Sequence, residues 1–376
     1  MMLYVAVRIL LYDKSRSLIT LVGVVFAVSL IFNQLGIFMG LMETSSVIID
    51  HTAGDIWITS KNSKNFDFAQ PFPEYVHELV LSEPGVEWAE KLIVAWGIIK
   101  QKEGGTEQVE LVGFNVDSGV GGPWDMQQGS VSQLKNGNFA IIDESSMARL
   151  GAIGIGEYRD VLSRRVQIVG ICRGVKSFTT APIMYTSFAL AQGLINYFPS
   201  ESTVFIVAKV RPGVSATVVA KRLAKRLTGN DVYTKHEFST KTRRYWAIET
   251  GVGFSFLLTI VISFLVGILI VGQTIYNSTM EHIKEFGTLK AMGADNRTIY
   301  RIILSQALIN ALLGYLISLI ITMLTVGLYD ALGMILVVRW WINLVVLTLT
   351  LGMCIIATVI SIRRIQRIDP AILFRG

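Results

Sequence analysis

The sequence carries few residues whose type and spacing support catalysis or metal binding. It has four histidines, none with a second histidine or a cysteine three or four residues away, as a metal site on one helix face would need. The hydrolase patterns Gly-x-Ser-x-Gly and His-Glu-x-x-His are absent. We therefore expect neither a catalytic residue nor a metal ligand in this chain. The four histidines are His51, His77, His236 and His282.

One glycine-rich segment superficially resembles a phosphate-binding loop. Gly151 to Gly156 holds three glycines, but no predicted strand leads into it and no helix with a ribose-binding acid follows, so we interpret it as a turn. The pattern Gly-x-x-x-x-Gly-Lys-Ser/Thr does not occur. We expect this chain to bind no cofactor. If ATP and Mg²⁺ drive its activity, a partner ATPase must bind them.

The most informative charge pattern lies between Tyr276 and Arg301. Glu281 and Glu285 are four residues apart and so share one face of a predicted helix. Gly293 predicts the end of that helix, and Asp295 is suited to cap the next one. The sequence thus predicts a helix, a sharp turn and a second helix. We interpret this segment as a docking element for another protein; the alternative is a solvated connector.

The whole composition places these residues in a membrane protein. Only 16% of the 376 residues are charged, whereas soluble proteins have about a quarter. A span needs about 20 apolar residues. The first apolar stretch is longer than that of a signal peptide, so we expect it to remain as a span. Four stretches without charge predict transmembrane helices at 18–42, 250–275, 302–329 and 340–362.

The positions of the basic residues predict the topology. Lys and Arg flank the spans in 1–17, 276–301 and 363–376, whereas the loop 330–339 holds a single Arg. Because cytoplasmic loops collect positive charge, we place both termini and 276–301 in the cytoplasm, with 330–339 as a short external loop. The net charge of +6 comes with no nucleic-acid-binding motif, so we expect no nucleic acid partner. Residues 1–17 are expected to form an amphipathic helix on the inner membrane face.

The interval 43–249 is polar enough to form a water-soluble α+β domain outside the membrane, inserted between the first and second spans. We expect it to have two lobes. The helix of the second span is expected to begin near Thr240, as a stalk. Cys172 and Cys354 lie in different parts of the chain, so no disulfide is expected. Predicted strands cover 55–59, 92–101, 108–113, 139–142, 165–171, 182–185, 203–210 and 231–235, and predicted helices 74–82, 144–150 and 215–227.

Two sequence signatures carry a resemblance to a known family. Residues 280–294 read MEHIKEFGTLKAMGA and resemble the E-x-x-x-E-h-G-x-L-[KR]-A-h-G-A signature of the FtsX/MacB-like ABC transporter permeases. Residues 32–36 further resemble the DevC-type branch, in which the ATPase is a separate subunit. In the C-terminal tail, the terminal D-P-A-x-x-h-R pattern of the family is matched by a run that includes Arg367, Asp369, Pro370 and Arg375.

The resemblance implies a permease subunit that is not itself an enzyme. Such permeases form homodimers or pseudo-dimers in the bacterial cytoplasmic (inner) membrane, and a cytosolic ABC ATPase binds the segment between the second and third spans; for this chain we expect a homodimer. ATP-driven closure then moves the extracytoplasmic domains, a mode called mechanotransmission. The implied assembly is an efflux machine with a periplasmic adaptor (membrane fusion) protein and an outer-membrane duct. The coupling residues that match the family are Glu281, Glu285, Gly287, Lys290 and Gly293, with Asp295 as the following cap.

Two alternatives share this architecture. One is an FtsX-like regulator of an extracytoplasmic cell-wall hydrolase, and the other is a lipoprotein-releasing permease. The length of 43–249 favours the exporter. Within the spans, Asn33, Gln34 and Gln273 are polar. They either join helices by hydrogen bonds, also in a dimer, or line a substrate path; we favour the structural role.

Overall fold

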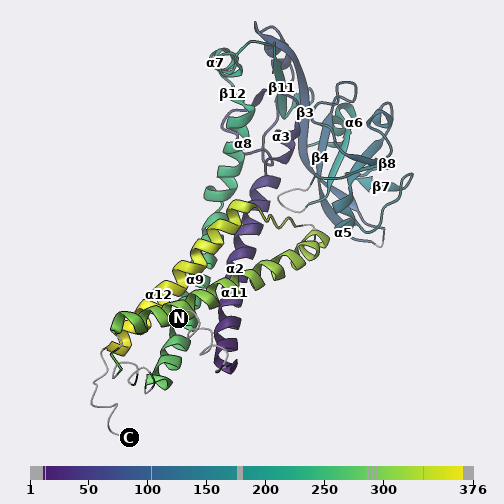
Figure 1. Ribbon diagram of the computed structural model, residues 1–376. Helices are drawn as coiled ribbons and strands as arrows, with labels where there is room; N and C mark the ends of the chain where they lie inside the picture. Colours follow the sequence, from purple (N-terminus) through teal and green to yellow (C-terminus); the bar gives the residue numbers. More distant parts are fainter. Residues whose placement is uncertain are drawn as a thin grey trace. The chain divides into compact units, whose positions relative to one another are not determined.

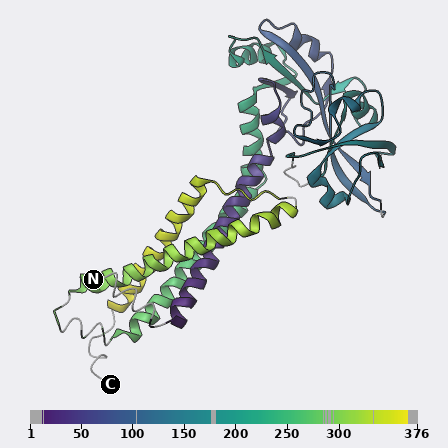
Figure 2. The ribbon, with the colours of Figure 1, turned by 45° about the vertical axis from the view of Figure 1, so that its right-hand side comes forward.

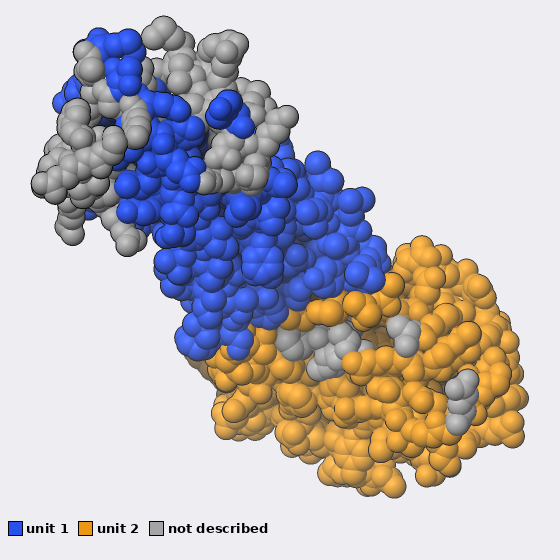
Figure 3. All heavy atoms as spheres, turned by 90° about the horizontal axis from the view of Figure 1, so that it is seen from below, with its two compact units in different colours: residues 1–39, 254–329, 335–376 blue, residues 40–253, 330–334 orange. Residues whose placement is uncertain are grey.

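The computed structural model of the chain describes residue 12 and residues 14–102, 104–175, 181–283, 285, 288, 292–293, 295–332 and 334–366. The chain divides into two compact units, which Figure 3 shows in different colours. We call residues 1–39, 254–329 and 335–376 the membrane unit. Residues 40–253 and 330–334 form the second unit, which we call the inserted domain.

Four helices of the described part are long and apolar enough to cross a membrane, with mean hydropathy between 2.2 and 2.9 over their most apolar windows. Their bounds in Figure 1 are α2 (Lys14–Thr44), α9 (Val252–Glu281), α11 (Asn296–Ala331) and α12 (Trp340–Gln366). Each contains one predicted span, except that α9 begins two residues after the predicted start at Thr250. The prediction of a four-helix membrane protein is confirmed.

Small residues let these helices approach closely. A Cβ atom added at Gly267 of α9 would lie 2.0 Å from Sδ of Met353 in α12 and 3.1 Å from Cβ of Ala27 in α2. Hydroxyl groups also join helices: Ser318 Oγ donates to the Val25 carbonyl at 3.0 Å, and Ser361 Oγ donates to the Gly272 carbonyl at 2.7 Å. Lipid provides no hydrophobic force between helices, so such packing and hydrogen bonds hold the unit together.

The inserted domain is built on one large sheet, with strand order β12-β1-β11-β3-β4-β9-β6-β8-β5. Its strands are β1 (Ile56–Ser60), β3 (Val86–Lys100), β4 (Thr106–Phe114), β5 (Met126–Gln128), β6 (Phe139–Asp143), β7 (Tyr158–Val161), β8 (Arg164–Cys172), β9 (Ile183–Ser187), β11 (Phe205–Val210) and β12 (Asn230–Thr234), while β2 (Phe72–Pro73) and β10 (Ser202–Thr203) pair separately. Its helices are α3 (Val47–His51), α4 (Val76–Leu81), α5 (Met147–Leu150), α6 (Phe188–Leu194), α7 (Ala216–Arg226) and α8 (Lys235–Arg244), with 3-10 turns at Val131–Leu134 and Glu144–Ser146.

The long strand β3 belongs to two parts of this sheet (Figure 1). Its first half pairs with β11, which continues through β1 to β12. Its second half pairs with β4, and β7 pairs with both β3 and β8. The strands β3, β4, β9, β6, β8 and β7 therefore close into a ring, which can be followed in Figure 2. Closure leaves few exposed strand edges on this side of the domain.

Two clusters of buried side chains accompany these two parts. One lies where α7 turns Val219 and Leu223 onto the strands β1 and β11. The other fills the ring and extends to Trp57 of β1 and Phe238 of α8. The predicted division into two lobes stays a prediction, because the sheet is continuous.

Each predicted strand and helix of this domain corresponds to an observed element with shifted ends. The predicted hairpin is the pair β3 and β4, whose register runs from Leu92 opposite Phe114 to Lys100 opposite Thr106. The sequence reasoning missed β2, β5, β7, β10, α3, α6 and the 3-10 turn at Val131–Leu134, which are all short. Short elements give too few turns or alternations for their periodicity to stand out.

The predicted stalk is not one continuous helix, and this expectation was wrong. α8 begins at Lys235, where Thr234 and Glu237 form a capping box. A π-helix follows at Tyr245–Glu249, and a turn at Thr250 and Gly251 separates it from α9. Gly251 has φ of +75°, which ends a right-handed helix and suits glycine, since it has no Cβ.

Candidate functional site

The predicted coupling segment, residues 276–301, begins as a direct extension of the second membrane helix. We call it the coupling segment below. α9 continues past the predicted span end at Ile275 and reaches Glu281. Glu281 and Glu285 are both exposed, and the side chain of Glu285 is 65% accessible. His282 lies buried between them, and its Nδ1 is 2.9 Å from Oε2 of Glu285. The sequence reasoning missed this pair, although the spacing of three residues on a helix was a usable signal.

The turn after this segment has the geometry that the sequence predicts. Gly293 has φ of +96°, a left-handed conformation that ends helices. Asp295 directly precedes α11, and its carbonyl accepts the backbone N–H of Thr298 at 2.9 Å. Their coupling role stays a prediction. The other predicted residues of the coupling segment and the tail lie outside the described residues: Gly287, Lys290, Arg367, Asp369, Pro370 and Arg375.

A small open groove lies at the same end of the membrane unit. It has a volume of about 330 Å³ and is lined by Ile19 of α2 and by residues of α9 from Thr274 to Glu281. Gln273 donates its amide to Oδ1 of Asn277 at 3.2 Å, one turn further along α9. Within one chain, the Gln273 side chain thus bonds to another side chain of its own helix. A role in a dimer or a path stays a prediction for it.

The polar pair in the first span behaves similarly. Asn33 donates Nδ2 to the Ser29 carbonyl at 2.8 Å, which is a bond within α2. Its Oδ1 and the Ser29 hydroxyl are buried and find no partner among the described residues. Gln34 is half buried. The free acceptor on Asn33 is compatible with either predicted role, a contact between helices of two chains or a polar point on a path.

Among the residues that the structure describes, no group of three His, Cys, Asp or Glu side chains is arranged to hold a metal ion. Cys172 and Cys354 are both buried and free. Burial and the nearby Asp143 carboxylate raise the pKa of the Cys172 thiol well above its ordinary value, so it does not form a reactive thiolate.

Charged and aromatic side chains attach α8 and the following π-helix to the rest of the inserted domain. Arg243 of α8 donates Nε to the Ser46 hydroxyl at 2.7 Å and a guanidinium N–H to Asp50 at 2.6 Å. Trp246 of the π-helix donates Nε1 to Oδ2 of Asp67 at 2.9 Å. Burial raises the pKa of Asp67 to about 6. No local pattern predicts these contacts, because their partners are 193 and 179 residues apart.

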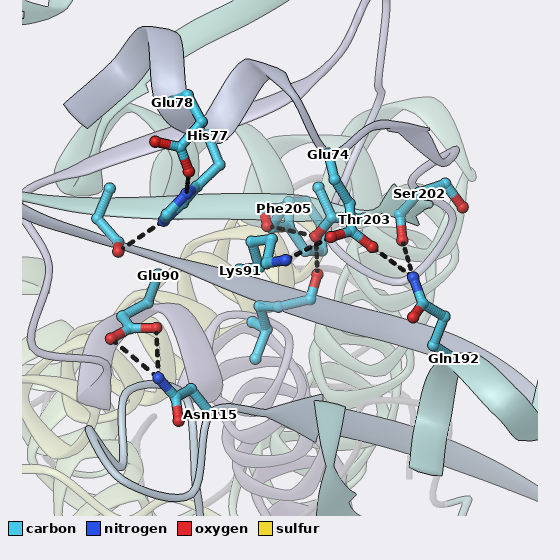
Figure 4. Close-up of polar contacts among 12 residues, drawn as sticks. Glu74, His77, Glu78, Glu90, Lys91, Asn115, Gln192, Ser202, Thr203 and Phe205 are labelled. Carbon is cyan, nitrogen blue, oxygen red and sulfur yellow. Dashed lines mark hydrogen bonds and ion pairs between the residues drawn. The ribbon is translucent and has the colours of Figure 1, made fainter. Parts of the chain in front are cut away.

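A larger groove, of about 890 Å³, lies on the inserted domain beside the first half of β3. Lys91 of its lining donates Nζ to Glu74, which also accepts from Nε2 of Gln192; neither partner lines the groove (Figure 4). Asn115 donates to both carboxylate oxygens of Glu90, at 3.0 and 3.3 Å. Most charged groups along this groove are thus paired internally. These bonds connect the segment before α4, strand β3 and helix α6.

Comparisons with known proteins agree with this architecture. Residues 17–226 match the MacB-like periplasmic core domain, and residues 255–370 match the FtsX-like permease C-terminal domain. An uncharacterised ABC transporter permease of Mycobacterium tuberculosis H37Rv is 24% identical over 380 residues, and another from Mycobacterium bovis is 24% identical over 381; each match covers 100% of both chains. The periplasmic region of MacB from Actinobacillus actinomycetemcomitans superposes with a TM-score of 0.40 and 13% identity over 50% of this chain and 92% of that chain. The chain belongs to the family of ABC transporter permeases that combine a MacB-like periplasmic core domain with an FtsX-like permease C-terminal domain.

Proposed function

We propose that this permease works by mechanotransmission in an exporter, coupling a separate cytosolic ATPase to motion of its inserted domain. The observation that carries the proposal is the attachment of α8 and the π-helix, the last helices of the inserted domain before α9, to the rest of that domain through Arg243 and Trp246. The chain then continues through α9 to the exposed acidic residues Glu281 and Glu285. Force applied at the coupling segment has a direct covalent route to the inserted domain.

The length of α9 suits this role. Its 30 residues span about 45 Å at a rise of 1.5 Å per residue, which is long enough to cross the membrane with a turn to spare. A turn that includes Gly251, with φ of +75°, joins the π-helix to α9.

The partners follow from the same reasoning. The sequence has no phosphate-binding loop, so ATP and Mg²⁺ would be bound by a cytosolic ABC ATPase subunit. Two copies of this chain would form a homodimer that presents two coupling segments to two ATPase subunits. The size of the inserted domain favours a periplasmic adaptor and an outer-membrane duct as further partners. The proposed location is the bacterial cytoplasmic (inner) membrane, with both termini in the cytoplasm.

Affinity purification of the tagged permease from its native cells tests the assembly. We expect an ABC ATPase, an adaptor and an outer-membrane duct to co-purify after mild cross-linking. A cell-wall hydrolase in their place would support the FtsX-like alternative, and a lipoprotein chaperone would support the lipoprotein-releasing one. Recovery of the permease without any ATPase would contradict the proposal.

A further inference from the structure

A pocket on the inserted domain combines a buried carboxylate with exposed aromatic rings. Its volume is about 260 Å³, just below the range of about 300 to 1,000 Å³ typical of sites for drug-sized ligands, so it suits a small head group. We call it the Asp67 pocket. Its lining comes from the loop before β2, from β3 and from the loop after α6: Asp67, Phe68, Ala69, Gln70, Pro71, Val94, Ala95, Trp96, Tyr197 and Phe198.

The carboxylate of Asp67 has neutral partners. Asp67 is 7% exposed, and its Oδ2 accepts from Nδ2 of Asn65 at 3.1 Å and from Nε1 of Trp246 at 2.9 Å. No Lys or Arg of the described residues forms an ion pair with it. Its pKa, raised by burial to about 6, still leaves the group ionised at pH 7.5. A buried negative charge without a cation is costly, and a bound cation removes that cost.

The walls of the pocket offer what an organic cation needs. Phe68 is 49% exposed and Tyr197 is 55% exposed, and both line the pocket. Tyr197 is held in place, since its hydroxyl donates to the Trp96 carbonyl at 2.8 Å. The Trp96 ring is fixed by a bond from Nε1 to the Asp67 carbonyl at 3.0 Å. Exposed ring faces attract cations electrostatically and favour quaternary ammonium groups.

We propose that the Asp67 pocket binds a small organic cation, with a quaternary ammonium head group against the aromatic rings and the Asp67 carboxylate as its counter-charge. This goes beyond the proposed transport function and does not depend on it. The side-chain hydrogen bonds to the carboxylate end on Oδ2, and Asp67 is one of the residues that line the pocket. The ligand and Trp246 then share one carboxylate, which connects occupancy to the π-helix before the second span.

Choline and its neutral isostere 3,3-dimethylbutan-1-ol test the proposal, since they differ in charge and hardly in shape. The full-length protein, purified in a neutral maltoside detergent at pH 7.5, is titrated with each by calorimetry. We expect saturable binding of choline and at least tenfold weaker binding of the neutral compound. Equal affinity for the two compounds, or no saturable binding of choline by the folded protein, overturns the proposal.

Variants separate this site from nonspecific binding. Asp67→Asn keeps an acceptor oxygen for Trp246 but removes the charge, and we expect at least a tenfold loss of choline affinity. Asp117→Asn is the matched control, because its side chain is 75% exposed on the same domain and lies outside the pocket; it should bind as the wild type does. If Asp67→Asn does not fold, Tyr197→Leu replaces it, since an exposed ring is not needed for folding, and we expect a severalfold loss. Wild-type choline affinity in both pocket variants would show that Asp67 only fastens Trp246.

Discussion

At the residue scale, Glu285 has a described partner on its own segment. His282 is buried, and its Nδ1 lies 2.9 Å from Oε2 of Glu285, whose own side chain is 65% accessible. This contact restricts the orientations of the Glu285 side chain. A side chain that is already oriented loses less entropy when a partner binds it. Glu285 is therefore a candidate for contact with the ATPase.

Reversal of that charge should uncouple transport. We expect Glu285→Lys to remain inserted in the membrane and dimeric, but to bind the ATPase at least tenfold more weakly and to lose export. Glu285→Gln should lie between this variant and the wild type. Co-purification of the ATPase and export by membrane vesicles are the measurements. Glu87→Lys, an exposed substitution of the same type on the inserted domain, serves as the control. Normal ATPase binding and export in Glu285→Lys would reduce the segment to a connector.

Asp67 should make the stability of the inserted domain depend on pH. Burial raises its folded pKa from 3.8 to about 6, so the folded state holds the proton more tightly than the unfolded state between these values. The neutral Asp67 carboxyl contributes its full share to the free energy of unfolding below about pH 4. That share is lost as pH rises through 6, because the buried carboxyl must then ionise, which lowers the free energy of unfolding by on the order of 3 kcal/mol. Asp67→Asn should therefore be more stable than the wild type at pH 7.5, and its advantage should be clearly smaller at pH 4.5, as measured by tryptophan fluorescence on heating. Parallel curves for the two proteins would contradict this.

At the element scale, the inserted domain depends on close contact between a strand and a helix. A Cβ atom added at Gly113 of β4 would lie 2.2 Å from Cβ of Ala191 in α6. Ala191 is fully buried and has no flexible end that can move aside. A side chain at position 113 must therefore push α6 away from the sheet. This weakens the packing of α6 on β4, the strand that pairs with β9.

Gly113→Ala should destabilise the domain by about 1 to 3 kcal/mol, the usual cost of overpacking. For a domain of this size, that lowers the melting temperature by at least 2 °C. Gly229→Ala is the matched control, because no atom lies within 4 Å of its added Cβ and its backbone conformation is an ordinary one. Thermal unfolding of the two variants in the same detergent measures the difference. Equal melting temperatures would show that α6 is not held against β4 as described.

At the scale of the whole molecule, the distribution of basic residues predicts a single orientation in the membrane. A reporter fused after Gly376 should be active only as a cytoplasmic protein, and one inserted at Gly119 only outside the cytoplasm. Gly119 is an exposed position with no atom near its added Cβ, so the insertion leaves the fold intact. Paired alkaline phosphatase and green fluorescent protein fusions report the two sides. If both sites lie on the same side, the topology is wrong.

The whole chain should also be inert towards nucleotide. Since its sequence holds no phosphate-binding loop, we expect the purified permease to show neither saturable binding of a fluorescent ATP analogue nor release of phosphate. The complex with its ATPase provides the positive control. Nucleotide binding by the permease alone would contradict the proposed division of labour between two subunits.

The sequence by itself determined the features that depend on neighbouring residues. A charge-free run of sufficient length is a membrane helix wherever it occurs, because its backbone must satisfy its own hydrogen bonds in lipid. The hairpin of β3 and β4 and the turn at Gly293 were likewise predictable from local alternation and from glycine. The break at Gly251, in contrast, was missed, because we expected a continuous helix from Thr240.

Only the tertiary structure decided which distant segments meet. Strand β7 is too short for local alternation to predict it. Its pairing with both β3 and β8 nevertheless closes the ring. The parallel pairs β4 with β9 and β6 with β8 join strands that are not consecutive, and such partners are selected by the surface they bury. The bond between Asp67 and Trp246 joins residues 179 positions apart. Its buried carboxylate has no local signature, because burial is a property of the surrounding fold and not of the residue.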